Sequence, residues 1–229
     1  ILHFSLMKEV IMKKLLFWLA LIVGTVALIG SCAKKDEATT AAATTTFTST
    51  TTAAGSITVG SVEMSGVYAS GCNTAGVAAA VTAGYFPSDI KANRDVIVVT
   101  GNDNVSEESH FYTDTSCSSL SASLKDGNDN FTVGDQSGDY YKVTYKETGF
   151  KVTAGTTVAK TYYENYFSTN NITASGTTID LVVGTEYDVG GSGYTEMNLY
   201  SVTSTQVQTG DDDRNTQPTA MDSLEMAKQ

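Results

Sequence analysis

Apolar side chains recur at every second position along much of the chain from Ser56 to Gly210. The clearest case runs from Tyr141 to Ala154, where apolar residues alternate with lysine and threonine on both sides of Glu147-Thr148-Gly149. A period of two places successive side chains on opposite faces of a strand, and a triplet that contains glycine between two such runs is typical of a turn. This stretch therefore predicts a β-hairpin with one apolar face.

Shorter runs with the same alternation predict further strands, separated by turns about every ten residues. They are residues 63–69, 95–100, 109–113, 120–124, 131–133, 158–166, 179–183 and 196–207, with a turn at Gly127-Asn128-Asp129. Only two segments favour helix: residues 75–83, predicted as a loop with one helical turn, and residues 221–226, predicted to form a short helix or to fray. Many short strands and only two prolines predict an all-β fold, either a small antiparallel β-barrel or, failing that, a β-sandwich.

The N-terminal part of the chain follows a different pattern. Met12-Lys13-Lys14 forms a short basic head, and the residues from Leu15 to Ile29 carry no charge. This profile predicts a signal peptide within residues 1–31, because a membrane-spanning helix needs about 20 apolar residues. Residues 1–11 lack the features of a signal peptide, so we expect translation to start at Met12. A retained N-terminal anchor helix is the alternative.

The signal peptide ends in Leu28-Ile29-Gly30-Ser31-Cys32, which resembles the lipobox of bacterial lipoproteins. The resemblance implies cleavage before Cys32 and attachment of a diacylglyceryl group to its thiol, followed by an N-terminal acyl chain such as palmitate. Two or more acyl chains hold a protein at a membrane far more firmly than one. Ala33 stands where aspartate marks inner-membrane retention in some bacteria, so the resemblance implies an outer-membrane location in the cell envelope.

Three regions follow the predicted cleavage site. Residues 32–55 are rich in threonine and alanine and are predicted to be a flexible linker, because they lack the apolar surface that offsets the entropy cost of ordering. Residues 56–210 have the length of one domain and carry the alternating pattern. Residues 211–229 are predicted to be an acidic C-terminal tail.

The chain is acidic, with a net charge of −11, and removal of the leader makes it more acidic still. This charge argues against nucleic acid as a partner, because phosphates require lysine and arginine. Two oxygen-rich turns, at residues 126–130 and 211–213, could attract calcium, but neither has the spacing of an EF-hand. We therefore expect solvated turns and no metal site.

Residues suited to catalysis are few. His110 is the only histidine after the leader, and we expect it to be structural or exposed. Gly190-Gly191-Ser192-Gly193 lacks the spacing of a nucleophile elbow, and zinc requires several histidine or cysteine ligands. Glu107 and Glu108 are adjacent, so on a strand they point to opposite faces and make a poor acid/base pair. The sequence predicts neither an enzyme nor a cofactor.

Cys72 and Cys117 are the two cysteines left after Cys32. An exported protein meets an oxidising environment, so this pair is expected to form a disulfide. Closing a loop of about 45 residues would stabilise the fold by roughly 4 kcal/mol in the chain-entropy description. A metal site or a reactive thiol is the weaker alternative.

Ser65-Gly66-Val67-Tyr68 precedes the main series of strands, and Arg214 stands near the end of the chain. A glycine and an aromatic residue on the first strand, with a late basic residue, resemble the lipocalin-like barrels, although lipocalins carry tryptophan where Tyr68 stands. The resemblance implies that Gly66, Tyr68 and Arg214 close one end of a barrel.

Two functions fit the sequence. The first is a membrane-anchored barrel that holds a small hydrophobic or amphipathic molecule in its interior. The second is a surface or periplasmic interaction protein or adhesin with a filled β core, which binds a macromolecular partner through its loops and outward tyrosines. Bulky inner residues such as Phe150 and Val152 could fill a small barrel, so the sequence leaves both functions in place.

Overall fold

The computed structural model of the chain describes residues 47–210 and 216–229. The predicted signal peptide, Cys32 and Arg214 lie outside these residues. The elements in chain order are β1 (Ile57–Val59), β2 (Val62–Met64), β3 (Val67–Ser70), α2 (Val77–Thr82), β4 (Ala92–Val99), β5 (Val105–Tyr112), β6 (Leu120–Ser137), β7 (Tyr140–Ala154), α3 (Thr157–Thr169), β8 (Thr173–Ala174), β9 (Thr177–Thr178), β10 (Glu186–Asp188), β11 (Thr195–Val202), β12 (Gln206–Gly210) and β13 (Met221–Lys228).

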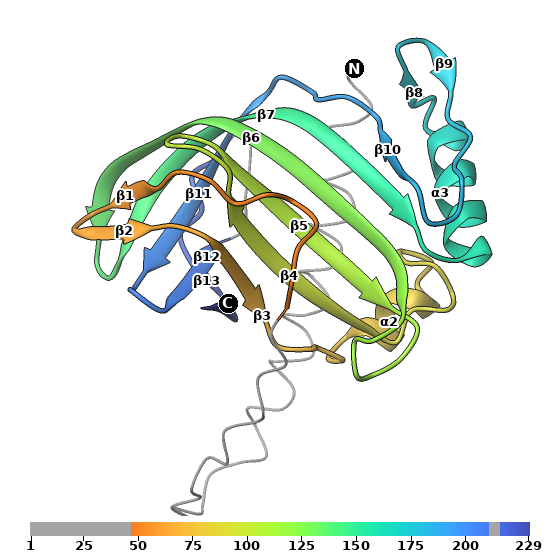
Figure 1. Cartoon of the computed structure of the whole chain (residues 1–229), viewed down its shortest axis with the longest axis horizontal. Helices are drawn as coiled ribbons and strands as arrows, with labels where there is room; N and C mark the ends of the chain where they lie inside the picture. Colours follow the sequence, from red (N-terminus) through yellow and green to blue (C-terminus); the bar gives the residue numbers. More distant parts are fainter. Residues whose placement is uncertain (1–46, 211–215) are drawn as a thin grey trace, which may run out of the picture.

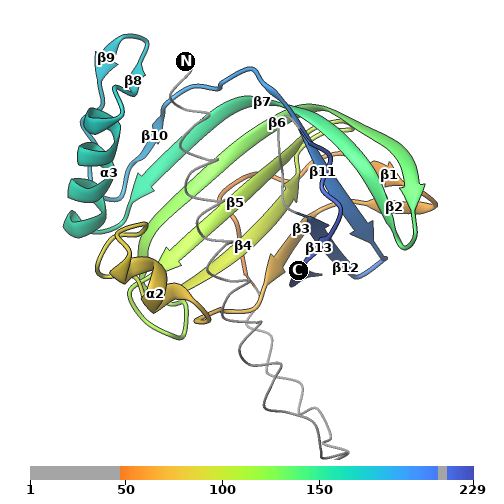
Figure 2. The same cartoon turned by 180° about the vertical axis from the view of Figure 1, so that it is seen from behind.

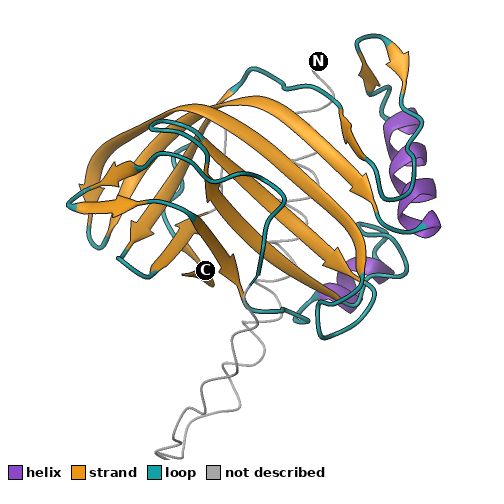
Figure 3. Cartoon of the chain, viewed as in Figure 1, coloured by secondary structure: helices purple, strands orange, loops and turns teal. Residues whose placement is uncertain are grey.

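Eight strands form a closed antiparallel barrel (Figures 1 and 3). Around the barrel the order is β7, β11, β12, β13, β3, β4, β5 and β6, and β6 pairs again with β7. Strand β10 continues the sheet beside the second half of β7, where Tyr187 stands opposite Val152. Closure leaves the eight strands without an unpaired edge. The predicted small antiparallel barrel is confirmed, and the sandwich alternative does not apply.

The predicted hairpin turn at Glu147-Thr148-Gly149 is wrong, because the residues on both sides of it belong to one strand, β7. Glu147 pairs with Asn128 of β6 and Gly149 pairs with Gly127, so Thr148 is an extra residue in the ladder. This β-bulge keeps the buried side chains before and after it on the same face. The apolar face that the alternation predicted therefore continues along the whole strand.

The predicted turn at Gly127-Asn128-Asp129 is wrong for a related reason: it lies inside β6, opposite the bulge of β7. The loop between β10 and β11 runs over the bulge, and Gly191 lies directly against Thr148. A Cβ atom added to Gly191 would come within 2.3 Å of the Thr148 carbonyl group, so the close approach requires glycine. Turn residues thus serve here to bend two long strands together.

Residues 158–166, predicted to be a strand, lie in helix α3. The side chain of Thr156 caps the helix by accepting a hydrogen bond from the backbone N–H of Ala159 at 3.1 Å. Ala159, Tyr163 and Phe167 are the buried residues of the helix, and they recur every fourth position. That spacing places them on one helical face, whereas a strand would have placed neighbouring tyrosines on opposite faces.

Two apolar clusters pack against the inner face of the sheet. The helix cluster, around Phe150 and Tyr163, lies where α2 and α3 cover one end of the barrel (Figure 2). The hairpin cluster, around Tyr68 and Phe131, lies at the opposite end beside the β1–β2 hairpin. Helix α2 itself lies within the loop at residues 75–83 that was predicted to hold one helical turn.

Two further segments differ from expectation. Residues 179–183 form no strand: Ile179 and Leu181 are buried in the helix cluster, but Val182 is 63% exposed. Residues 221–226, expected to form a helix or to fray, belong to strand β13, which pairs with both β12 and β3. The barrel therefore extends to residue 228, past the boundary at residue 210 that the composition suggested.

The last part of the predicted linker, residues 47–55, packs against the outer wall of the barrel; we call it the strap. Phe47 packs on Ala69, Val96 and Val98, and the Ala54 N–H donates to the Val99 carbonyl at 2.9 Å. Short hydroxyl side chains complete the contact, since Ser49 and Thr51 donate to Glu108. Composition suggested a free linker, but these hydroxyls find buried acceptors on the barrel.

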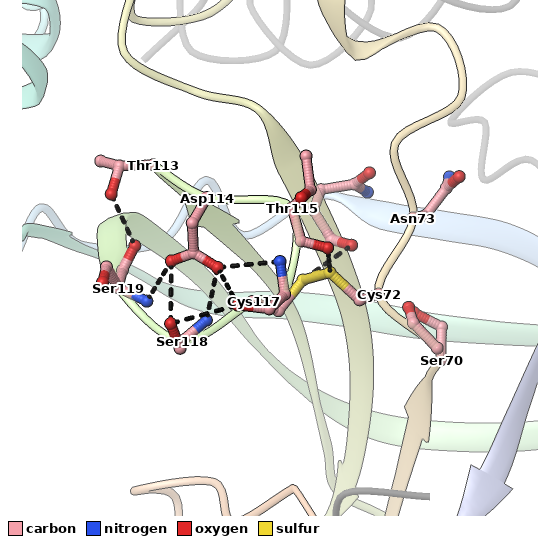
Figure 4. The surroundings of a disulfide bond; sticks show 12 residues. Ser70, Cys72, Asn73, Thr113, Asp114, Thr115, Cys117, Ser118 and Ser119 are labelled. Atoms are coloured by element: carbon pink, nitrogen blue, oxygen red, sulfur yellow. Dashed lines mark hydrogen bonds between the residues drawn. A yellow bond between two sulfur atoms is a disulfide. The ribbon is translucent and has the colours of Figure 1, made fainter. Parts of the chain in front are cut away.

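The predicted disulfide between Cys72 and Cys117 is confirmed, with Cα atoms 5.8 Å apart (Figure 4). It joins the segment after β3 to the loop between β5 and β6. In that loop Asp114 accepts hydrogen bonds from the backbone N–H groups of Ser116, Ser118 and Ser119. A hydrogen bond from the Ser116 side chain and those from the backbone hold the pKa of Asp114 well below its ordinary value.

Candidate functional site

A cluster of polar side chains crosses the inner face of the barrel between the two apolar clusters. Its centre is Glu107 of β5, whose carboxylate accepts hydrogen bonds from the Tyr145 hydroxyl of β7 at 3.1 Å and the Tyr200 hydroxyl of β11 at 2.7 Å. Strand β5 is a neighbour of neither β7 nor β11 in the barrel. Glu107 can therefore meet the two tyrosines only across the interior.

Phe131 of β6 positions the two phenols. Its ring stacks on Tyr145 with centroids 5.9 Å apart and meets Tyr200 edge-on at 5.1 Å. Both tyrosines and Phe131 are buried in the hairpin cluster, so the rings are fixed by packing while their hydroxyl groups reach the carboxylate. An apolar cluster thus holds the hydrogen-bond donors in place.

Two asparagines extend the cluster. Asn198 of β11 donates from Nδ2 to the Tyr145 hydroxyl at 3.2 Å, and its Oδ1 accepts from the Leu199 N–H. Asn128 of β6 donates from Nδ2 to Glu107 at 3.4 Å. Asn128 is 2% exposed, yet its Oδ1 accepts no hydrogen bond from the described residues. A buried amide oxygen without a donor is uncommon and costs about 1–3 kcal/mol.

Three more carboxylates lie on the same face, because directly opposed residues of an antiparallel pair point to the same side. Asp126 stands opposite Glu107, Glu147 stands opposite Asn128, and Glu196 stands opposite Tyr145. Glu147 and Glu196 are fully buried, and the Ser192 N–H donates to Glu147 at 3.1 Å. We call the set of eight residues the inner polar band; its members are Glu107, Asp126, Asn128, Tyr145, Glu147, Glu196, Asn198 and Tyr200.

A further carboxyl group, Asp95 of β4, lies beside the band on the neighbouring strand. Ser109 stands directly opposite it and donates to its Oδ1 at 2.8 Å. Burial raises the pKa of Asp95 above the ordinary value, although the hydrogen bond from Ser109 works against the shift. The inner wall is thus rich in carboxyl groups over several adjacent strands.

The band is not completely covered. Glu107 and Asp126 point inward but are only half-buried, and so are Ser109 and Leu124 on the same face. Leu124 packs at the edge of the helix cluster, so the half-buried acidic side chains adjoin an apolar surface on this wall.

The barrel-closing residues implied by the lipocalin resemblance lie at the hairpin end. Tyr68 is fully buried in the hairpin cluster, and Gly66 adopts a positive φ of 86° immediately before β3. The ammonium group of Lys228 stands 5.7 Å from the centre of the Tyr68 ring. Arg214 lies outside the described residues. Lys228 was not predicted in this position, because it belongs to the segment expected to be a tail.

His110 lies on the outer wall beneath the strap, not in the interior. It is 7% exposed, bonds Glu108 at 2.7 Å and meets the Phe47 ring edge-on at 5.0 Å. Glu107 and Glu108 do point to opposite faces, as the alternation predicted. The structure thus places His110 with the strap and separates it from the carboxylates of the inner polar band.

The oxygen-rich segment at residues 126–130 is part of β6, not a solvated turn. Within residues 47–210 and 216–229, no group of three or more histidine, cysteine, aspartate or glutamate side chains is arranged to hold a metal ion. The other candidate turn, at residues 211–213, lies outside the described residues.

The sequence did not reveal the inner polar band as a unit. Its residues come from β5, β6, β7 and β11, and only pairing between distant segments brings them together. A signal was present in β7, where Glu147 occupies an inward position of an otherwise apolar face. Because Glu147 was predicted to lie in a turn, its inward position on a strand was not recognised.

No family model matches the chain, and no curated protein matches its sequence. Among the helices of the described residues, none has both the length and the apolar character needed to cross a membrane. The inner polar band and its apolar flanks are therefore the observations from which a function must be argued.

Proposed function

We propose that this protein is a lipid-anchored component of the bacterial cell envelope whose β-barrel binds a small amphipathic molecule. The resemblance of Leu28-Ile29-Gly30-Ser31-Cys32 to a lipobox supports the anchor, with Cys32 as the acylated residue. Ala33 supports the outer membrane as the location. The protein acts by binding and not by catalysis, and its partners are the membrane and the ligand.

The inner polar band carries this proposal. Polar side chains inside a small barrel cost free energy unless they serve specific contacts, and a barrel that needs only stability is better filled by apolar residues. Here the band lies between two apolar clusters and borders Leu124, so one molecule can place a polar group on the band and an apolar part beside the helix cluster. Concave sites with a few fixed polar groups are typical of small-molecule binding.

Native mass spectrometry of the purified chain tests the proposal. A discrete added mass that disappears on denaturation and is recovered in organic extract is the expected result. A clean apo mass, both for protein isolated from its own envelope and after incubation with that lipid extract, would contradict binding. Radiolabelled palmitate incorporation, lost in Cys32→Ser, tests the anchor separately.

An interaction protein is the second candidate function. Val182 is 63% exposed, and Val183 and Val158 are each 43% exposed. Lys160 near the start of α3 donates to the Leu181 carbonyl at 2.6 Å, so these valines lie on one part of the surface. Exposed apolar patches often bind macromolecules. Loss of envelope-partner crosslinking in Val182→Asp, with ligand binding intact, would favour this function.

A further inference from the structure

We infer that Arg94, on the outer wall of the barrel beside the start of the strap, binds an oxyanion that carries one negative charge, a carboxylate or a phosphodiester group. Arg94 belongs to β4, and its guanidinium group lies over the Phe47 ring, 5.4 Å from the ring centre. The site is separate from the inner polar band, so this inference does not rest on the proposed function.

The guanidinium group of Arg94 is buried without a hydrogen-bond acceptor. Arg94 is 7% exposed, and within residues 47–210 and 216–229 it forms no ion pair and donates no hydrogen bond. Its Nε is enclosed by protein, whereas the two terminal nitrogens are not enclosed and face solvent. The Phe47 ring attracts the positive charge but offers no lone pair to the N–H groups, so the guanidinium still needs an acceptor.

Carboxylates on the same wall are bonded to other groups. Glu108 accepts hydrogen bonds from the strap hydroxyls and bonds His110, which stands directly opposite Arg94. Glu186 bonds Lys125, a second buried cation of this wall, at 2.7 Å. Lys125 thus has a carboxylate partner, and Arg94 has none among the described residues. A buried charge without a partner costs free energy, and a bound anion would relieve that cost.

Tyr112 of β5 supplies a second donor. It pairs with Ala92, two positions from Arg94 on the same face of β4, and diagonal neighbours in a sheet are within reach of long side chains. Burial raises the pKa of Tyr112 and the positive charge of Arg94 opposes the rise, which is consistent with a hydroxyl close to that charge. In the part of the chain that the structure describes, this hydroxyl has no hydrogen-bond partner. Both groups can therefore donate to one anion.

The side of Arg94 that faces β3 is open to solvent. Ala69 of β3 stands opposite Val96, and the chain after β3 pairs again with β4 at Asn73, so Gly71 lies beside Arg94. Gly71 is exposed, and a Cβ atom added to it would meet no atom within 4 Å. An anion can therefore reach the terminal nitrogens while the strap stays in place.

The charge of the site defines the ligand class. Arginine binds carboxylates and phosphates through two parallel hydrogen bonds. One positive charge is unpaired here, so an anion with a single negative charge matches it. A doubly charged anion would leave one charge unmatched close to Glu108, in a chain with a net charge of −11. Soluble molecules and lipid head groups can both present an oxyanion of this kind.

Arginine side-chain NMR tests the site, because the chain contains two arginines, Arg94 and Arg214. The purified full chain labelled with ¹⁵N-arginine gives two Nε–H signals, which Arg214→Lys assigns. At pH 7 and constant ionic strength, acetate and dimethyl phosphate should each shift the Arg94 signal along a saturable curve, and chloride should not. An Arg94 signal that stays unmoved, or that responds equally to chloride, would overturn the inference.

Two variants separate a local site from overall charge. Arg94→Gln and Lys91→Gln each remove one positive charge, and Lys91 is exposed immediately before β4. Dimethyl phosphate should raise the melting temperature of the wild type and of Lys91→Gln, and leave that of Arg94→Gln unchanged. Equal responses of the two variants would contradict a site at Arg94.

Arg94→Lys covers the case in which Arg94→Gln does not fold. It keeps the charge but loses the paired donors, so it should weaken dimethyl phosphate binding about tenfold. Unchanged affinity in this variant would show that the guanidinium group is not the ligand-binding group.

A short-chain lipid distinguishes the two sources of the anion. Dihexanoylphosphatidylglycerol, kept below its micelle concentration, presents the same phosphodiester with glycerol and acyl groups attached. If it shifts the Arg94 signal at a concentration about tenfold lower than dimethyl phosphate does, the site accepts a lipid head group. Equal or weaker affinity assigns the site to a soluble oxyanion.

Discussion

Replacing Glu108 by alanine should release the strap from the barrel wall. Glu108 is 3% exposed and holds three groups at once: both carboxylate oxygens accept from the Ser49 hydroxyl at 3.0 Å, one accepts from Thr51, and the other bonds His110 at 2.7 Å. In these contacts the strap hydroxyls and His110 are joined through Glu108, so the substitution breaks the link between them. His110 would be left buried beneath a loosened strap.

The expected loss of stability follows from these contacts. A hydrogen bond to a charged group contributes about 1.5–3 kcal/mol, and removing one partner of a buried pair costs about 3–5 kcal/mol. The strap can partly withdraw and let water reach His110, so Glu108→Ala should lower the free energy of unfolding by about 3 kcal/mol. Glu108→Gln keeps the shape and one acceptor oxygen and should cost roughly half as much.

Urea unfolding followed by circular dichroism measures the free energy, and limited proteolysis with fragment masses reports cleavage within residues 47–55. Glu63→Ala, on an exposed position of β2, is the control and should change neither. If Glu108→Ala unfolds at the wild-type urea concentration and its strap resists the protease as before, the strap does not depend on Glu108 and the reasoning is refuted.

The same contact predicts a dependence on pH. Burial raises the pKa of Glu108, but hydrogen bonds from His110 and Thr51 and the charge of Lys125 outweigh it, so the pKa lies below the ordinary value of 4.5. A lowered pKa in the folded state gives stability that is present above pH 4.5 and is lost as the pH falls through the lower folded value. In Glu108→Gln this part of the acid-induced loss of stability should be absent.

Three further predictions concern other parts of the fold. Replacing Cys72 and Cys117 by serine opens a loop with a sequence separation of 45 and should lower the free energy of unfolding in urea by about 4 kcal/mol. Reductant should have no further effect on this variant. Equal stability of the oxidised wild type and the variant would contradict the prediction. Gly191→Ala should cost about 1–3 kcal/mol because its Cβ meets the Thr148 backbone, whereas Gly149→Ala, with nothing within 4 Å, should cost much less; thermal melting compares the two. Burial raises the pKa of Tyr162 and of Tyr166 to about 12 and that of Tyr163 further. An alkaline absorbance titration should therefore show delayed ionisation of these tyrosines, and the stability of the fold should decline as the pH rises above 10, the ordinary tyrosine value. Ionisation of all tyrosines near pH 10 in folded protein would disprove this prediction.

Local alternation predicted the strand faces well, because the side-chain period is a property of the backbone. It placed Glu107 and Glu108 on opposite sides and predicted the apolar face of β7. The disulfide was also predictable, because only two cysteines remained in a domain that was predicted to be exported. Local alternation was misleading at residues 158–166, which it predicted as a strand and which form helix α3.

Errors arose where distant segments decide the local structure. Glycine with a small polar neighbour favours a turn, but Gly127 and Gly149 stand opposite each other and bend a pair of long strands instead. The pairing of Ser70 with Met226 joins the two ends of the domain, and nothing in residues 221–226 alone indicates a strand. The inner polar band was missed for the same reason, because its members come together only when the barrel closes.

The central claim is that a small molecule binds at the inner polar band, and tyrosine ring resonances test it most directly. In NMR spectra of the chain with labelled tyrosine rings, the organic extract of the envelope should shift the signals of Tyr145 and Tyr200, assigned with Tyr145→Phe and Tyr200→Phe, and leave Tyr140 unmoved. Shifts confined to Tyr140 or other outer tyrosines, with Tyr145 and Tyr200 unchanged at saturation, would contradict the account.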